Sequence, residues 1–294
     1  MKKNIIIVTG GAGFVGSNLI ELLLKKTRFK IISYDNYSTG SYSNHIKNKR
    51  ASYIKAHTKN ISKILNKKKK NINSIFHFGE FARIYQSFNK MSECIESNSI
   101  GSFEVFKFCL DNKIKLIYSA TSASLGNKGK DKNLSPYAFT KSNNLEFLEN
   151  IKKWFDFKFE IIYFYNVYGP KQIRKGYMAT VIGIFEEAFI KKTPLLVVKP
   201  GTQSRRFTHI SDTIDVCYEA WKKNKSRHYS ISNKKSYTIL EVAEMFKSKI
   251  KFLPARKGER YASALTNMNL FNKVIKKFGK IGLKEYITQI IKKK

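Results

Sequence analysis

A glycine-rich turn near the start of the chain constrains the fold more than any other feature of the sequence. Residues 4–9 form a run dominated by β-branched side chains, which is typical of a strand buried in a parallel sheet. Gly10, Gly13 and Gly16 follow, and an apolar periodicity across residues 14–24 then predicts a helix. Strand, glycine turn and helix therefore adjoin in the order that a βαβ unit requires.

This arrangement predicts a dinucleotide site. Glycines let the backbone approach a pyrophosphate, and the helix N-terminus offers free N–H groups and the positive end of its dipole. Asp35 ends the next predicted strand, 30–34, where a carboxylate accepts hydrogen bonds from ribose hydroxyls and repels a 2′-phosphate, so NAD is favoured over NADP. A turn that only packs the helix on the strand is the alternative. The predicted cofactor-binding residues are Gly10, Gly13, Phe14, Val15, Gly16, Asp35 and Asn36.

The rest of the chain alternates predicted strands with predicted helices. Strands are expected at 74–78, 115–119 and 159–163, and helices at 91–110 and 136–154. Such alternation predicts an α/β fold with a Rossmann-type doubly wound parallel sheet.

Helical patterns at 179–190, 212–222 and 239–250 predict a smaller, mostly C-terminal α/β substrate-binding domain. We expect residues 1–168 to form the NAD-binding domain, with 200–233 rejoining it through a strand at 229–232. Residues 169–199 and 234–294 would then form the second domain.

A second group of residues indicates acid–base chemistry. Ser135 and Pro136 are typical of a helix start, which places Tyr137 and Lys141 four residues apart on one helical face. A neighbouring ammonium can lower the pKa of a phenol enough for proton transfer near neutral pH. The hydroxyl-rich segment 119–124 follows a predicted strand, at the sheet edge where ligands bind. For Tyr137 and Lys141, the alternative is an ordinary pair of surface side chains. For the segment 119–124, the alternative is a polar turn.

The composition excludes several other classes of protein. The formal net charge is +35, from 56 basic and 21 acidic residues, but the lysines are spread along the chain and outnumber the arginines. Nucleic-acid readers concentrate arginines and aromatics on one face, so we expect no nucleic-acid partner. Three distant cysteines without a CxxC predict neither disulfide nor metal site. No segment reaches transmembrane length, so a cytoplasmic protein without a membrane partner is expected.

Taken in order, the motifs resemble a known enzyme family. They are TGGAGFVG, YDN, HFG, the Ser/Thr cluster, YAFTK, FYNVYGP and RRFTHISD. This series is similar to that of the extended short-chain dehydrogenase/reductases, within the NAD-dependent nucleotide-sugar epimerase/dehydratase family that includes UDP-glucose 4-epimerase. The resemblance extends from about Lys3 to Thr266.

The resemblance implies roles for particular residues. It implies further cofactor contacts at His77, Phe78, Gly79, Asn98, Tyr137 and Lys141. It implies Thr121, Tyr137 and Lys141 as catalytic residues. It implies substrate contacts at Thr121, Asn166, Arg205, Arg256, Glu259 and Ser263. Glu80 departs from the family pattern, in which small residues are commoner, and the sequence provides no role for it.

The implied reaction is epimerisation at carbon four of a nucleotide sugar through a 4-keto intermediate. Ser122 and Ala123 stand where the family's dehydratases carry Asp and Glu, which disfavours dehydration. Expected substrates are a UDP-hexose or a UDP-N-acetylhexosamine for surface-glycan synthesis, since a small Ser263 would leave room for an acetamido group. A nucleotide-deoxysugar 4-reductase is the alternative enzyme, and a non-catalytic dinucleotide- or RNA-binding relative is the alternative outside enzymes. The family also implies a homodimer through helices 91–110 and 136–154.

Overall fold

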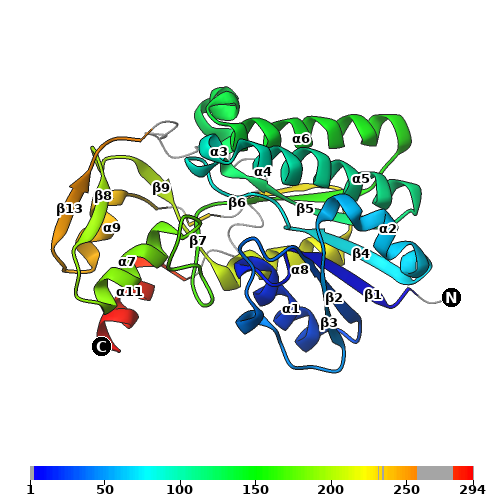
Figure 1. Ribbon diagram of the computed structural model, residues 1–294, viewed down its shortest axis with the longest axis horizontal. Helices are drawn as coiled ribbons and strands as arrows, with labels where there is room; N and C mark the ends of the chain where they lie inside the picture. Colours follow the sequence, from blue (N-terminus) through cyan, green and yellow to red (C-terminus); the bar gives the residue numbers. More distant parts are fainter. Residues whose placement is uncertain (1–2, 231, 234, 257–280, 294) are drawn as a thin grey trace.

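A seven-stranded parallel sheet forms the centre of the protein, with strand order β11-β6-β5-β4-β1-β2-β3 (Figure 1). The computed structural model describes residues 3–230, 232–233, 235–256 and 281–293. Strand order reverses between the neighbouring strands β1 and β4, which opens a crevice at their carboxyl ends. The strands of the sheet are β1 (Ile5–Thr9), β2 (Lys30–Asp35), β3 (Ala51–Lys55), β4 (Ile72–His77), β5 (Lys115–Thr121), β6 (Phe159–Phe164) and β11 (His228–Ser230).

Helices cover both faces of this sheet because the strands are apolar on both sides. One face is covered by α1 (Phe14–Lys26) and α8 (Ile210–Lys223), which share one apolar core. The other face is covered by α2 (Ile61–Leu65), α5 (Ser102–Asp111) and α6 (Pro136–Phe155), which share a second core (Figure 1). Shorter segments around them are η1 (Tyr42–Asn44), η2 (Thr58–Asn60), η3 (Asn66–Asn71), α3 (Gln86–Asn89), α4 (Met91–Ile95), η4 (Glu96–Gly101) and η5 (Ser122–Asn133).

A third apolar core lies in the C-terminal lobe, beside the carboxyl ends of the sheet strands (Figure 1). Its helices are α7 (Val181–Ile190), α9 (Ile239–Met245) and α11 (Leu283–Lys292). Three two-stranded ladders complete it: β13 (Ile250–Leu253) with β8 (Leu195–Val198), β12 (Ser236–Thr238) with β9 (Ser204–Arg206), and β10 (Thr208–His209) with β7 (Val167–Tyr168). No helix in the described ranges is long and apolar enough to cross a bilayer.

The predicted α/β architecture is confirmed, and strand bounds differ by only one or two residues in most cases. The extension of β5 to Thr121 places that residue at the strand end instead of in the following loop. Helix α6 begins as predicted, since the Ser135 hydroxyl accepts a hydrogen bond from the Ala138 N–H at 3.1 Å and Pro136 occupies the first turn. The edge strand β3 escaped prediction because it is short and only half-buried.

One predicted helix is corrected, and a second is confirmed with one difference in its hydrogen bonding. The pattern at 239–250 holds only for α9, because Lys247 adopts a left-handed conformation (φ 52°) and the chain then enters β13. The pattern at 91–110 is divided into α4, a π-helical segment η4, and α5. The whole stretch is helical, as predicted, and the change to i→i+5 hydrogen bonds in η4 is a detail that the apolar pattern did not indicate.

Candidate active site

The glycine turn forms a cradle between β1 and α1. Gly10 has φ +68°, and a Cβ built on it would lie 2.9 Å from the Gly79 nitrogen. A Cβ on Gly16 would lie 2.2 Å from the Gly10 carbonyl oxygen. Gly13 precedes the first turn of α1, and no side chain caps that helix. The backbone therefore leaves both space and unpaired N–H groups for an anionic ligand at this end of α1.

Asp35, at the end of β2, connects this cradle to the next loop. Its Oδ2 accepts a hydrogen bond from the Ala12 N–H at 2.9 Å, and its Oδ1 accepts one from the Tyr37 N–H at 2.8 Å. Burial raises the pKa of Asp35, and these backbone N–H groups act in the opposite direction. A carboxylate has about four lone-pair sites and Asp35 lines the cavity, so it can also accept from a ribose hydroxyl.

One cavity of about 650 Å³ joins the cradle to the C-terminal lobe. Its walls contain the carboxyl ends of the sheet strands and residues of α6, α7 and β8. Among the predicted site residues, the cavity is lined by Gly10, Gly13, Phe14, Val15, Gly16, Asp35, Asn36, Phe78, Gly79, Thr121, Tyr137, Lys141, Asn166, Arg205 and Arg256. Glu259 and Ser263 lie outside the described residues.

The structure places His77 and Asn98 behind the cavity wall, where both are fully buried. The Asn98 amide accepts a hydrogen bond from the Phe81 N–H at 2.7 Å and donates one to the Phe81 carbonyl at 3.1 Å. It thereby fixes the loop after β4, which does line the cavity. Asn98 and His77 thus support this wall and do not themselves reach the cavity surface.

His77 is part of a directional chain of hydrogen bonds. The Ser102 hydroxyl donates to Glu80 Oε1 at 2.9 Å, so Ser102 must accept from His77 Nε2 at 2.9 Å. His77 Nδ1 then accepts from the Thr9 hydroxyl at 2.7 Å, while Thr9 Oγ1 accepts from two backbone N–H groups of the loop after β4. Burial lowers the pKa of His77 to about 4, in agreement with a neutral ring.

Tyr137 and Thr121 reach the cavity from different elements. Tyr137 lies in the first turn of α6, where its N–H donates to the Ser87 hydroxyl at 3.2 Å. Thr121 ends β5, and its Oγ1 accepts from the Ala123 N–H at 3.2 Å. Both side chains line the cavity together with the glycine cradle. A hydroxyl and a phenol therefore face the same space as the predicted dinucleotide site.

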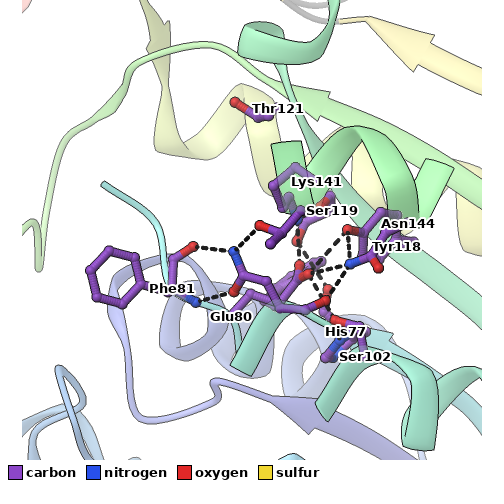
Figure 2. A network of polar contacts seen from close by, with 12 residues as sticks. His77, Glu80, Phe81, Ser102, Tyr118, Ser119, Thr121, Lys141 and Asn144 are labelled. Carbon is purple, nitrogen blue, oxygen red and sulfur yellow. Dashed lines mark hydrogen bonds and ion pairs between the residues drawn. The ribbon is translucent and has the colours of Figure 1, made fainter. Parts of the chain in front are cut away.

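Lys141 lies one turn further along α6, and its ammonium is paired with Glu80 (Figure 2). The two side chains are only 4% and 3% exposed, and the ammonium also donates to the Ser119 carbonyl. Burial lowers the pKa of Lys141, and the Glu80 carboxylate acts against that change. The sequence marked Glu80 as unusual for its position, but the ion pair across sixty residues became visible only in the fold.

Basic side chains line the part of the cavity that faces the C-terminal lobe. Arg205 is buried on β9, and Arg256 lies over the Tyr85 ring at 5.3 Å. Asn166 donates to the Arg206 carbonyl at 2.8 Å. Arg83, which the sequence analysis did not single out, also lines the cavity and donates to the Met178 carbonyl from Nε at 3.0 Å. Guanidinium groups in this position suit a phosphorylated ligand.

These features together fit NAD. The cradle contains glycines where a Cβ would collide, the helix N-terminus is uncapped, and an acidic side chain ends the second strand. Among the described residues, no group of three or more His, Cys, Asp or Glu side chains could hold a metal ion. The doubly wound sheet with this cradle and a Tyr137–Lys141 helix defines an extended short-chain dehydrogenase/reductase.

The protein belongs to the NAD dependent epimerase/dehydratase family, whose model matches residues 6–232. It is 28% identical over 258 residues to ADP-L-glycero-D-manno-heptose-6-epimerase of Brachyspira hyodysenteriae, covering 82% of this chain and 80% of the relative. The structure of UDP-glucose 4-epimerase from Thermotoga maritima superposes with a TM-score of 0.87 at 23% identity, covering 98% and 97% of the two chains. UDP-N-acetylglucosamine 4-epimerase from Methanobrevibacter ruminantium superposes with a TM-score of 0.82 at 24% identity, with both chains fully covered. Family membership makes NAD the cofactor.

Proposed function

We propose that the protein is a nucleotide-sugar 4-epimerase that acts on a UDP-hexose or a UDP-N-acetylhexosamine, for surface-glycan precursor synthesis. One observation carries the proposal: a single cavity joins the glycine cradle, the Tyr137 phenol and the arginines of the C-terminal lobe. Such a cavity can hold a dinucleotide and a diphosphate-linked sugar with the reacting carbon between them. The superposition with 4-epimerases of UDP-sugars supports the fold that this arrangement requires.

The cofactor and the diphosphate would be held at opposite ends of the cavity. Asp35 would accept from the adenosine ribose, and the N–H groups at the start of α1 would bind the pyrophosphate. Arg205, Arg256 and Asn166 would hold the nucleotide-sugar diphosphate, where a guanidinium can form two parallel hydrogen bonds to phosphate. Both ligands are anionic, which fits the basic lining.

The proton chemistry would belong to Tyr137. Its Oη would take the proton from the sugar 4-hydroxyl and later return it, while Thr121 Oγ1 would donate to the same sugar oxygen. Lys141 Nζ would donate to the nicotinamide ribose. When bound, NAD supplies hydride exchange at carbon four, which converts that carbon to a ketone and back. The cavity would have to leave the keto sugar room to turn between Tyr137 and the cofactor, so that its other face could be reduced.

The residues after Thr121 support epimerisation over dehydration. Elimination of a sugar hydroxyl needs an acid and a base beside carbons five and six. Here Ser122 and Ala123 follow the strand end, and both are buried. The described segment therefore supplies no carboxyl group directly after Thr121 for that chemistry.

The test is an assay of the purified protein with UDP-glucose, UDP-galactose and their N-acetylated counterparts, with product sugars separated by chromatography. We expect reversible interconversion of each pair without net change in NADH absorbance. Stoichiometric nicotinamide consumption would instead identify a 4-reductase. Inversion at carbon six of a heptose, with no change at carbon four, would contradict the proposed reaction centre.

We also propose a homodimer formed through the helices at 91–111 and 136–155. Large apolar side chains are exposed on these helices, at Met91, Ile95, Ile100, Phe103, Phe139, Trp154 and Phe155. Covering such a row of side chains with a second copy would remove apolar surface from water.

A further inference from the structure

Glu80 is the centre of a buried polar network beside the cavity (Figure 2). It follows β4 in the loop that Asn98 fixes, and its carboxylate receives donors from three other elements. Oε2 is paired with the Lys141 ammonium. Oε1 accepts from Ser102 Oγ at 2.9 Å, Tyr118 Oη at 3.0 Å and Asn144 Nδ2 at 3.2 Å.

Hydrogen bonds fix the orientation of both the Glu80 carboxylate and the Lys141 ammonium. Within the described part of the chain, two of the three N–H groups of the Lys141 ammonium are used, by Glu80 and by the Ser119 carbonyl. The Tyr118 ring lies against the ammonium, with Nζ 4.4 Å from the ring centre. Because Lys141 also lines the cavity, its remaining N–H is the one available to a ligand.

A buried ammonium needs a counter-charge. Removing one partner of a buried ion pair leaves the other unpaired in a medium of low polarity, which is strongly unfavourable. Lys141 and Glu80 are almost completely buried, and Asn98 fixes the loop after β4 that carries Glu80. The network therefore both balances the Lys141 charge and fixes its direction.

We propose that Glu80 is a positioning residue, which holds the Lys141 ammonium charged and directed toward the nicotinamide ribose of NAD. The inference rests on the proposed role of Lys141 in cofactor binding. It does not depend on which sugar carbon the enzyme inverts.

Of the four titratable groups beside this ion pair, three keep one protonation state over the pH range of the test. The titratable groups that face it are His77 on β4, Cys94 on α4, Tyr118 on β5 and Tyr137 on α6. Burial lowers the pKa of His77 to about 4, raises that of Cys94 to about 11 and raises that of Tyr118 well above its ordinary value, so all three are neutral near pH 8. Without Glu80, burial would be the largest remaining influence on the pKa of Lys141 and would favour loss of its proton.

The experiment is titration of the full-length protein with NADH, followed by nicotinamide fluorescence, between about pH 6.5 and 9. We expect Glu80→Gln to weaken NADH binding about tenfold near neutral pH, and increasingly as the pH rises, since a charged hydrogen-bond donor is misdirected and then lost. The wild-type affinity should vary much less over the same range. Glu21→Gln is the matched control, because it breaks the exposed ion pair with Lys171 and should leave NADH binding unchanged.

A double-mutant cycle separates positioning from general support of the fold. In a Lys141→Met background, Glu80→Gln should leave the NADH affinity unchanged, because the group through which Glu80 acts is gone. An equal loss of affinity with and without Lys141, or a Glu80→Gln variant with the wild-type pH profile, would overturn the proposal.

If Glu80→Gln does not fold, Glu80→Asp carries the test. It keeps the charge but withdraws the carboxylate by one methylene, so we expect weaker NADH binding with little pH dependence. Wild-type affinity in Glu80→Asp would overturn the proposal. Wild-type protein that binds NADH but inverts no sugar would refute the proposed reaction and leave this inference standing.

Discussion

The Tyr137 phenol is the single group on which the proposed proton transfer depends. It reaches the cavity from the first turn of α6, beside Thr121 from the end of β5. Among the residues that pack against its ring are the apolar Phe81 and Met178, and Tyr137→Phe keeps that ring. A change that removes only the hydroxyl should therefore affect chemistry far more than structure.

We expect Tyr137→Phe to lower kcat at least about a hundredfold, because the proton acceptor for the sugar hydroxyl is removed. NADH affinity and thermal unfolding should remain close to those of the wild type, since the ring still fills its place. Steady-state kinetics with the preferred UDP-sugar and fluorescence titration would measure both. Retention of most of the activity would show that another group moves the proton.

His77 gives the second prediction for a single residue. Its folded-state pKa is lowered from 6.5 to about 4, so between these values the unfolded chain binds more protons than the folded one. The free energy of unfolding should therefore rise with pH across this window, by on the order of 3 kcal/mol from His77 alone. Protonation would also oblige Thr9 to accept another hydrogen bond, although its oxygen already accepts two.

Urea unfolding of wild type and His77→Gln at about pH 7.5 and 5 would measure this contribution. The variant is expected to be less stable at neutral pH and to lose less stability on acidification. Equal losses in the two proteins would show that His77 does not titrate in this range.

At the scale of elements, α5 and α6 pack against the sheet on one side and expose apolar side chains on the other. The buried sides of α5 and α6 complete a core with β4 and β5, and the inner side of α6 carries Lys141 to Glu80. Their outer sides expose aromatic and aliphatic residues. The proposed dimer surface is therefore the back of the same helices that form the site.

Phe103→Glu should convert the proposed dimer to a monomer, because a charge placed in an apolar interface cannot be desolvated at low cost. Phe103 is 45% exposed on α5, and Phe252 on β13 is 44% exposed, so Phe252→Glu is a matched control in the other lobe. Light scattering after size exclusion would give the mass of each. A wild-type monomer, or a Phe103→Glu dimer, would contradict the proposed surface.

For the molecule as a whole, the dominant physical property is its net charge of +35. Arginines at the cavity attract a ligand at short range. Lysines over the whole surface attract it at long range, while it diffuses toward the cavity. A nucleotide sugar carries negative charge on its diphosphate, so both contributions have the same sign. A positive charge spread over the surface is therefore suited to a small anionic substrate.

We expect kcat/KM for the UDP-sugar to fall several-fold as salt rises from about 20 to 300 mM, because screening weakens long-range attraction. The value of kcat should change little, since the chemistry occurs in a cavity shielded from bulk ions. Steady-state kinetics at several ionic strengths would separate the two. If kcat/KM did not change with salt, the surface charge would have no role in attracting the substrate.

The sequence by itself determined the features that depend on short-range order. Gly10 to Gly16, Asp35 after a buried strand, and the Ser135 cap before Tyr137 are local patterns, and the sheet, its cradle and the start of α6 follow from them. Only the tertiary structure decided the ion pair of Glu80 with Lys141, because it joins a loop after β4 to a helix after β5. The same reason applies to Arg83 and to Asn98, since whether a polar side chain faces a ligand or a backbone depends on how distant segments pack. Local spacing sets the backbone, whereas the partners of buried charges are set by the alignment of strands and helices far apart in the chain.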